Sequence, residues 1–451
     1  MTAAHKQELS NENGEQRVNA YRDLRVALLG CGSVGAQVAR LILENGDELA
    51  ARIGARLTLD GIAVRTLDAE RDVALPQELF TTDAERLVQG ADIVIELMGG
   101  IEPARSLILL ALSGGADVVT ANKALIAAHG RELSDAADQV GAQLLYEASV
   151  AAAIPILRPL RESLAGDHIT RVMGIVNGST NYILDRMDRF GESAEDAMKL
   201  ASDLGFLEAD PTLDVEGFDA AQKATILASI AFHTEVPESA VYREGITGVT
   251  LDQITAARHA GFVIKLLAVA ERLTASDGTD GVSVRVYPAL IPREHPLAAV
   301  YEGKNAVFVE AEAAGELMFY GAGAGGNETA SAVLGDLVSA ARRHVVGGPG
   351  IPGSTHAEFP VLSVGEVMTA YQVMLEVRDE PGVLARVAGI LAAHGVSAAS
   401  VEQNVSEAGR ATLVIGTHTA READLAATVD ALRADDAVAE VTSVLRREGR
   451  A

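Results

Sequence analysis

Residues 24–35, LRVALLGCGSVG, join an aliphatic run to a glycine-rich turn. The run predicts a buried strand, and Val38, Leu41 and Ile42 follow the turn with the spacing of one helix face. Between a strand and a helix, a G-x-G-x-x-G turn binds a dinucleotide, because its glycines permit the tight turn, admit the pyrophosphate and let the helix pack closely. The helix N-terminus adds positive potential. We therefore predict that a dinucleotide contacts Gly30, Gly32, Ser33, Val34 and Gly35.

Short aliphatic runs continue to alternate with amphipathic stretches over residues 21–150. Strands that alternate with helical stretches in this way indicate βαβ units and a parallel sheet. The sequence thus predicts an α/β protein whose N-terminal domain is a Rossmann-type parallel sheet. The further runs are residues 62–64, 93–95, 118–120 and 144–146.

Arg65 bears on the choice of cofactor, because it directly follows the predicted second strand. An NAD enzyme usually carries an acidic residue there for the ribose hydroxyls, whereas a guanidinium suits a 2′-phosphate. This favours NADP over NAD. The alternative is a solvated arginine at a strand end, which leaves NAD possible.

The composition excludes several classes of protein. A chain of 451 residues predicts two or three domains, and a net charge of −26 argues against nucleic acid and anionic membranes as partners. One cysteine cannot form an internal disulfide, and no apolar stretch approaches the roughly 20 residues of a membrane span. We expect a soluble, cytoplasmic protein with a loose polar tail over residues 1–20.

Three further segments follow the first domain. Residues 151–345 mix helical and strand-like patterns, which predicts a separate α+β domain. Residues 346–366 contain GGPGIPG, which breaks helix and strand and predicts a linker. Residues 367–451 have the order strand, helix, strand, strand, helix, strand, which predicts a ferredoxin-like module.

Two lysines lie in suggestive places. Lys123 follows Thr120 at the end of a predicted parallel strand, and open α/β sheets bind ligands at that edge. Lys223 lies four residues after Asp219 on a predicted helix, so the two can pair. A lysine beside a carboxylate in a cleft can deliver a proton to an oxygen that accepts hydride. The alternative is an ordinary exposed pair on a helix.

Six stretches together resemble the homoserine dehydrogenase family, whose members interconvert L-homoserine and L-aspartate 4-semialdehyde with NAD(P)H. The resemblance covers nearly everything after residue 20. It implies a place in threonine, methionine and isoleucine biosynthesis, and a homodimer or homotetramer. The stretches are residues 30–35, 121–125 (ANKAL), 146–150 (YEASV), 174–182 (GIVNGSTNY), 205–223 and 321–326 (GAGAGG).

The resemblance also implies roles for individual residues. Lys223 corresponds to the proton donor to the aldehyde oxygen, and Lys123 to its partner beside nicotinamide and substrate. Phe206 stands where the family often has tyrosine, and Glu328 where it often has proline. The implied substrate-binding residues are Glu208, Asp219, Asp214, Asn177, Gly178 and Ser179, and further cofactor contacts are Thr120, Lys123, Gly205, Gly323 and Gly325.

The resemblance implies a monovalent cation as well, typically sodium, near the domain hinge. Its ligands are Glu147 and the carbonyls of Val150, Ala152 and Ile154. Residues 151–153 are alanines where glycines are common, so the carbonyls can ligate only if the backbone angles suit alanine.

The C-terminal module resembles an ACT domain through RDEPGVL, residues 378–384, and GVS, residues 395–397. A Pro-Gly turn that leads into a helix offers free N–H groups to an amino-acid carboxylate. Asp379 and Ser397 are the implied effector contacts, and L-threonine is the implied effector. The alternative is a module that only extends a dimer interface.

Two other functions compete. Some 2-hydroxyacid dehydrogenases also carry an ACT module, but their nucleotide domain is inserted late, whereas the glycine turn here begins at residue 30. An amino-acid sensor without turnover would fit the alanines at residues 151–153. Retention of Lys123, Lys223, Glu208 and Asp219 favours the enzyme.

Overall fold

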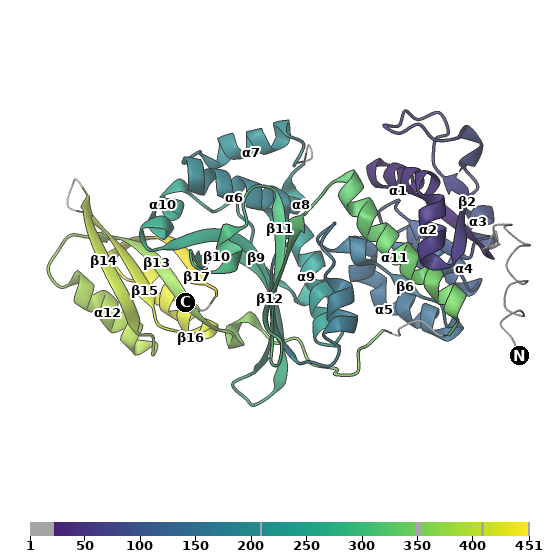
Figure 1. Cartoon of the computed structure of the whole chain (residues 1–451). Helices are drawn as coiled ribbons and strands as arrows, with labels where there is room; N and C mark the ends of the chain where they lie inside the picture. Colours follow the sequence, from purple (N-terminus) through teal and green to yellow (C-terminus); the bar gives the residue numbers. More distant parts are fainter. Residues whose placement is uncertain (1–21, 208–209, 349–352, 407–409, 450–451) are drawn as a thin grey trace, which may run out of the picture.

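The computed structural model describes residues 22–207, 210–348, 353–406 and 410–449. The tail predicted for residues 1–20 lies outside this part of the chain. The described chain forms three bodies in a row, with the N-terminal sheet at the right of Figure 1, a large sheet at the centre and the C-terminal module at the left.

The first body is a six-stranded sheet in the order β3-β2-β1-β4-β5-β6, and every neighbouring pair is parallel. This confirms the Rossmann-type prediction. Its strands are β1 (Arg22–Leu29), β2 (Ala55–Ala63), β3 (Phe80–Thr81), β4 (Ile93–Glu96), β5 (Asp117–Thr120) and β6 (Leu144–Leu145), and its helices are α1 (Ser33–Glu44), α2 (Gly46–Ile53), α3 (Ala84–Gln89), α4 (Ala104–Ser113) and α5 (Lys123–Val140).

Two strands of this sheet differ from the expectation. β2 begins at Ala55, earlier than the aliphatic run at residues 62–64 indicated. Its first residues alternate between buried and exposed positions, and only its last three form a continuous buried run. The alternation marks a strand with one solvated face. β3 was not predicted, because two residues paired only to Ile62 and Ala63 are too short to carry a periodic signal.

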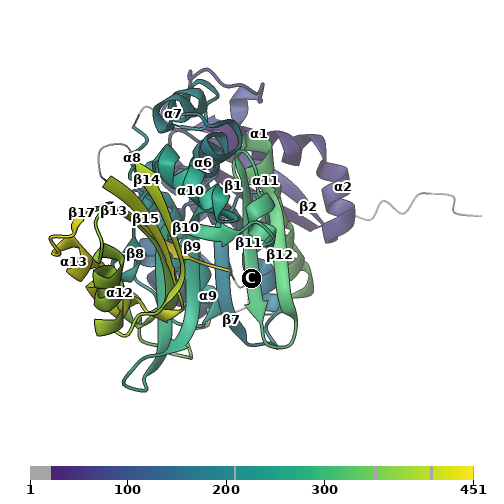
Figure 2. The same cartoon turned by 90° about the vertical axis from the view of Figure 1, so that its left-hand side faces the viewer.

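The second body is a mixed sheet in the order β12-β11-β7-β9-β10, with helices packed against it. Figure 2 shows these long strands edge to edge. The strands are β7 (Ile169–Ile175), β8 (Tyr242–Arg243), β9 (Phe262–Thr274), β10 (Asp280–Pro292), β11 (Lys304–Ala311) and β12 (Gly315–Ala322), and the helices are α6 (Gly178–Phe190), α7 (Ala194–Asp203), α8 (Thr212–Val215), α9 (Phe218–Ala231) and α10 (Leu251–His259).

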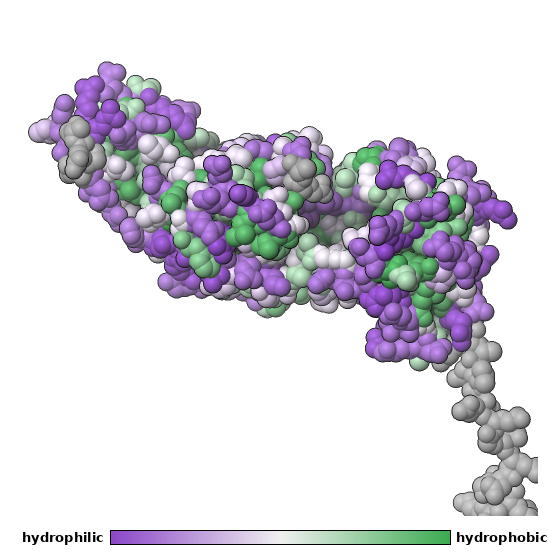
Figure 3. All heavy atoms as spheres, turned by 90° about the horizontal axis from the view of Figure 1, so that it is seen from above, coloured by the Kyte–Doolittle hydropathy of each residue, from purple (hydrophilic) through white to green (hydrophobic). Residues whose placement is uncertain are grey.

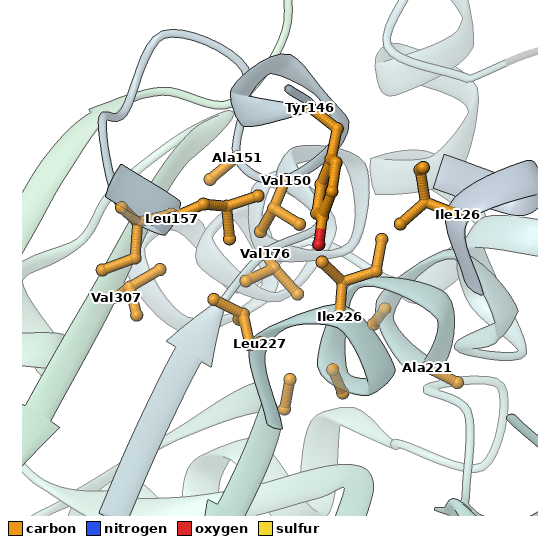
Figure 4. Close-up of a cluster of buried hydrophobic side chains, with 14 of the residues drawn as sticks. Ile126, Tyr146, Val150, Ala151, Leu157, Val176, Ala221, Ile226, Leu227 and Val307 are labelled. Carbon is orange, nitrogen blue, oxygen red and sulfur yellow. The ribbon is translucent and has the colours of Figure 1, made fainter. Parts of the chain in front are cut away.

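One hydrophobic core joins the first two bodies. In Figure 4 the ring of Tyr146 lies among Ile126 of α5, Ile226 of α9 and Val150 of the connecting segment, all members of one buried cluster. Buried apolar contact across a junction stabilises the relative position of the elements that make it. Helices α5 and α9 are therefore packed together where the two bodies meet.

Helix α11 (Gly326–Val346) returns from the second body to the first. Its buried residues Ala330, Val333 and Leu337 share a core cluster with β1. The helix thus packs on the N-terminal sheet, although the boundary predicted from sequence placed it in the second domain. An apolar helix face shows that it is buried but does not show against which neighbour.

The third body has the predicted order, with four antiparallel strands arranged β17-β13-β15-β14 and two helices. This confirms the ferredoxin-like prediction. Its elements are β13 (Met368–Arg378), α12 (Val383–Ala393), β14 (Ala398–Ser406), β15 (Arg410–Thr417), β16 (Ala420–Arg421), α13 (Glu422–Arg433) and β17 (Val438–Arg447). Single helical turns lie at Gln77–Leu79, Glu147–Ser149, Pro159–Ser163, Glu238–Ala240, Pro296–Ala299 and Val364–Glu366.

Strand β17 also pairs with β10, so the sheets of the second and third bodies are continuous. A buried ionic cluster supports this junction. Arg285 of β10 pairs with Glu271 at 2.7 Å and with Glu448 at 3.1 Å, and Glu448 also pairs with Arg171. The end of the chain is thereby fixed to the second body.

The predicted linker is ordered over the part described. The Thr234 hydroxyl donates to the Phe359 carbonyl at 3.0 Å, and Leu362 N donates to the Val282 carbonyl at 2.7 Å. Residues 349–352 lie outside the described chain. Among the described residues, no helix is both long and apolar enough to cross a lipid bilayer.

Candidate active site

The glycine turn has the shape that a dinucleotide requires. Gly30 has φ of 98°, and a Cβ there would lie 2.7 Å from the Leu97 carbonyl. A Cβ on Gly35 would lie 2.3 Å from the Gly30 carbonyl, whereas one on Gly32 would meet nothing within 4 Å. Gly32 therefore leaves open space in front of α1, whose first turn has no side-chain cap. Free N–H groups and an open backbone fit a pyrophosphate.

Two arginines follow β2 beside this turn. Gly30 N donates to the Ala63 carbonyl at 2.9 Å, which brings the end of β2 to the glycine turn. Arg65 is exposed two residues later. Arg71, which we did not single out, stacks on Phe80 at 4.1 Å and holds its loop through backbone carbonyls. No sequence signal distinguishes Arg71 from other loop arginines.

The predicted cofactor residue Thr120 is fully buried at the end of β5. Its hydroxyl donates to Glu96 at 2.6 Å and accepts from Asn122 N at 3.0 Å. The Glu96 carboxylate also accepts from Met98 N at 2.7 Å. The Thr120 hydroxyl therefore supports the segment that ends in Lys123, and Glu96 is a supporting residue that the sequence reading missed.

Lys123 and Lys223 meet at one carboxylate. Lys123 opens α5, because Asn122 caps that helix by accepting from Leu125 N at 3.1 Å. Its Nζ lies 3.1 Å from Asp219 Oδ1, and Lys223 Nζ lies 2.7 Å from Asp219 Oδ2. The Lys123 side chain is 40% exposed and that of Lys223 is 12% exposed. One carboxylate thus bridges two ammonium groups, one of them partly exposed.

Electrostatics at Asp219 favour its anion. Burial alone would raise the pKa of Asp219, but the charges of Lys223 and Lys123 and two side-chain hydrogen bonds outweigh it and hold the pKa well below its usual range. The group is therefore ionised at neutral pH and can orient both lysines.

Asn177 connects this trio to Asp214. Its Nδ2 donates to Asp214 Oδ1 at 2.6 Å and to Asp219 Oδ2 at 2.9 Å, while its Oδ1 accepts from Thr180 N at 2.9 Å as the cap of α6. Burial, with a smaller contribution from the Asp219 charge, raises the pKa of Asp214. A helix cap from α6 therefore joins carboxylates from α8 and α9.

The remaining predicted substrate residues lie around this cluster. Ser179 donates to the Phe206 carbonyl at 2.6 Å, and Gly205 has φ of 76°. A Cβ on Gly178 would lie 2.6 Å from the Gly303 carbonyl, so only glycine fits. Glu208 lies outside the described residues. Viewed from above, the surface is hollowed between the first two bodies (Figure 3).

The predicted cation ligand Glu147 is buried and holds the segment that follows it. Its carboxylate accepts from the backbone N–H groups of Ile156, Leu157 and Arg158 at 2.5, 2.8 and 2.8 Å. These hydrogen bonds fix the direction of a buried carboxylate and use three of its roughly four acceptor sites. The sequence could not reveal this, because the donors lie nine to eleven residues away.

The backbone around the other predicted cation ligands leaves their carbonyl oxygens available to a cation. Ala151 and Ala152 have φ of 58° and 48°, the left-handed conformation usually taken by glycine. Within the described chain, no backbone hydrogen bond ends on the carbonyl oxygens of Val150, Ala152 or Ile154. These carbonyls can therefore serve as hard ligands for a monovalent cation.

The predicted effector residues are exposed on the third body and are not joined by a contact. Asp379 accepts from Gln403 at 3.4 Å, and the Ser397 carbonyl accepts from His418 N at 2.8 Å. Gly382, with φ of 96°, precedes α12, whose first turn has no side-chain cap. Free N–H groups therefore lie close to Asp379 in the chain.

Three family models match the chain. They describe "Homoserine dehydrogenase, NAD binding domain" over residues 30–147, "Homoserine dehydrogenase" over residues 155–338 and "ACT domain" over residues 371–437. Among curated proteins, the homoserine dehydrogenase of Mycobacterium tuberculosis is 54% identical over 431 residues, which cover 94% of this chain and 97% of that protein. The homoserine dehydrogenase of Corynebacterium glutamicum is 52% identical over 425 residues, which cover 94% of this chain and 95% of that protein.

Solved structures agree. A homoserine dehydrogenase from Thiobacillus denitrificans has a TM-score of 0.88 and 38% identity, and the match covers 95% of this chain and 98% of that one. A hyperthermophilic archaeal homoserine dehydrogenase in complex with NADPH has a TM-score of 0.58 and 28% identity, and the match covers 72% of this chain and 99% of that one.

Proposed function

This chain belongs to the homoserine dehydrogenase family and is an NAD(P)-dependent oxidoreductase, and from that premise we propose the residue roles, cofactor preference, cation and regulation of its reaction. The observation that carries the proposal is the carboxylate of Asp219, which bridges Lys123 and Lys223.

Lys223 is the proposed proton donor to the aldehyde oxygen in reduction and the acceptor in oxidation. Its Nζ donates to the Val176 carbonyl and to Asp219, both at 2.7 Å, so two hydrogen bonds fix its direction. Bound NAD(P)H supplies the hydride from C4 of its nicotinamide. Lys123 adds a second positive charge beside the oxygen that gains negative charge, which stabilises the transition state.

The substrate's ammonium group is the proposed partner of the carboxylates. Asp214 and Asp219 both accept from the Asn177 amide, so the two carboxylates lie close together. Glu208, by its family resemblance, completes this set. An ammonium group held by fixed carboxylates positions the aldehyde carbon with little freedom.

The decisive experiment follows absorbance at the nicotinamide band after the protein, NADPH and L-aspartate 4-semialdehyde are mixed. We expect rapid oxidation of NADPH, and none with D219N at the same protein concentration. An active D219N would remove the two-lysine bridge from the chemistry.

NADP is the proposed preferred cofactor. Arg65 and Arg71 both follow β2, close to the glycine turn, and provide two positive charges for a 2′-phosphate. Comparison of kcat/KM for NADPH and NADH tests the preference, which is wrong if NADH is used equally well.

Sodium is the proposed cation, held by Glu147 and by the carbonyls of Val150, Ala152 and Ile154. Left-handed angles at Ala151 and Ala152 support this. Activity in sodium chloride should exceed activity in tetramethylammonium chloride at equal ionic strength. Equal activity in both salts would argue against the cation.

Feedback inhibition by L-threonine through the third body is the last part of the proposal, and it implies an enzyme of threonine, methionine and isoleucine biosynthesis. The third body shares strand pairing with the second, which supports transmission between them. We expect D379A in the full chain to need a higher threonine concentration for half-inhibition, with basal kcat unchanged. Equal inhibition of D379A and the parent would place the effector elsewhere.

A further inference from the structure

Asn305 has a buried side-chain amide that forms no hydrogen bond with the described part of the chain, and it lies beside the proposed active site. It is the second residue of β11 and has no solvent exposure. Among the described residues, it is the one side chain with two buried polar atoms that both lack a partner. Burial of unpaired polar atoms costs free energy that a leucine of similar size would avoid. The amide therefore requires a functional explanation.

Two glycines lie close to the Asn305 amide. A Cβ on Gly323 would lie 2.3 Å from Asn305 Cγ and Oδ1 and 2.5 Å from Nδ2. A Cβ on Gly178 would lie 3.5 Å from Oδ1. The amide thus lies flat against Gly323 and close to the start of α6, one residue from the Asn177 that binds Asp214 and Asp219.

The turn over residues 323–325 connects the two bodies that enclose the hollow. It follows β12 and leads into α11, which packs on the nucleotide-binding sheet. A Cβ on Gly326 would lie 3.0 Å from the Ser33 carbonyl, so the end of the turn touches the glycine turn of the cofactor site. The turn therefore has Asn305 on one side and the cofactor turn on the other.

The backbone of Asn305 is held by strand pairing, whereas the turn is rich in glycine. Asn305 pairs with Gly321 of β12, and Asn181 Nδ2 donates to the neighbouring Lys304 carbonyl at 3.2 Å. Lys265, itself buried, donates to Asn181 Oδ1 at 2.9 Å. By contrast, the turn contains Gly323 and Gly325, and Gly325 has φ of 132°, which only glycine adopts readily.

We propose that Asn305 is a positioning residue for the turn 323–325 in the dinucleotide-bound state. The turn shifts when the cofactor binds, its backbone pairs with the Asn305 amide, and the pairing holds the turn against the dinucleotide. An amide suits this task because it offers both a donor and an acceptor to a peptide group. The inference rests on the proposed binding of NADPH at the glycine turn.

The first test compares the full-length parent with N305L. The dissociation constant of NADPH, measured by nucleotide fluorescence without substrate, should rise about tenfold, the loss expected when a peptide group loses its hydrogen bonds. The midpoint of thermal unfolding without nucleotide should stay equal or rise, because an unpaired amide has been removed. The KM for NADPH should rise about tenfold, with kcat and the KM for the aldehyde within twofold.

A matched control is S283A, because Ser283 on β10 also has a buried hydroxyl without a partner in the described chain. It should leave the NADPH dissociation constant unchanged. The proposal is overturned if N305L binds NADPH within twofold of the parent, or if kcat and the aldehyde KM change as much as the NADPH KM. If the parent itself fails to bind NADPH, the proposed function fails instead.

A crystal structure of the parent with NADPH tests the same inference if N305L does not fold. Asn305 Nδ2 should lie within about 3.2 Å of a backbone oxygen of the turn 323–325, the range of a hydrogen bond. An amide still unpaired with the turn in that complex would overturn the proposal.

Discussion

Two clusters of charged side chains in this molecule differ in their access to solvent. Lys123, Asp219 and Lys223 meet where α5 and α9 begin, and Lys123 is 40% exposed. Arg285 and Glu448 meet between the second and third bodies, with side chains 1% and 4% exposed. Both clusters consist of paired charges, so buried ion pairs alone do not identify an active site. The first cluster differs from the second in that a ligand can reach it from solvent, through the exposed Lys123 side chain.

The origin of the two clusters differs as well. The first has its groups near helix starts and strand ends, where open α/β sheets bind ligands. The second lies on strand interiors and at the end of the chain, where β17 pairs with β10. We therefore expect changes in the first cluster to affect rate, and changes in the second to affect stability.

The sharpest test of this comparison is Lys223→Met. Loss of the proton donor should lower kcat about 10³-fold, within the range for general acid catalysis, with the NADPH dissociation constant and the unfolding midpoint nearly unchanged. Lys199→Met on the exposed face of α7 is the matched control and should be fully active. An equal loss in kcat and in NADPH affinity would exclude Lys223 from the chemistry.

The opposite test is Glu448→Ala. It leaves Arg285 and Arg171 without their buried partner and should lower the free energy of unfolding by about 3 kcal/mol, measured by urea denaturation. Where the variant is folded, kcat should stay within threefold of the parent. Glu440→Ala, exposed on β17, the strand that ends just before Glu448, should have little effect on stability. A parent-like unfolding midpoint for Glu448→Ala would mean that the junction is not held by these charges.

The buried carboxyl group of Asp336 on α11 contacts Glu147 N and Arg158 and should make the stability of the protein depend on pH. Burial raises the pKa of Asp336 to about 6, against the hydrogen bond from Glu147 N and the charge of Arg158, which lower it. The folded state holds this proton more tightly than the unfolded state. The protonated Asp336 carboxyl therefore contributes to the free energy of unfolding below about pH 4, and this contribution is lost as pH rises through 6. The loss is about 2–3 kcal/mol.

The difference in unfolding free energy between the parent and Asp336→Asn, measured from pH 4 to 7, should therefore change by that amount, with the parent losing stability. Asp138→Asn, exposed on α5, should show no such trend. A constant difference between the parent and Asp336→Asn would show that Asp336 titrates normally.

The smallest expected effect is at the cofactor turn. Arg65→Asp reverses an exposed charge beside it and should weaken NADPH binding about tenfold while NADH binding stays the same. Arg56→Asp, exposed earlier on β2, makes the same change in charge and should weaken NADPH much less. Equal effects from the two variants would indicate long-range electrostatics in place of a direct contact.

Local patterns predicted a large part of the fold. The parallel sheet, the βαββαβ module and the glycine turn all follow from periodicity and from strand–turn–helix order, which neighbouring residues determine. The pairing of Asp219 with Lys223 was equally accessible, because four residues along a helix always bring two side chains to one face.

The tertiary structure alone decided which distant groups meet. Lys123 reaches Asp219 from another helix, α11 packs on the first sheet, and β17 joins β10. Tertiary contacts also decided that the Glu147 carboxylate binds backbone N–H groups and that the Asn305 amide faces Gly323. The physical reason is that a sequence pattern records whether a side chain is buried, whereas its partner depends on how complete elements pack.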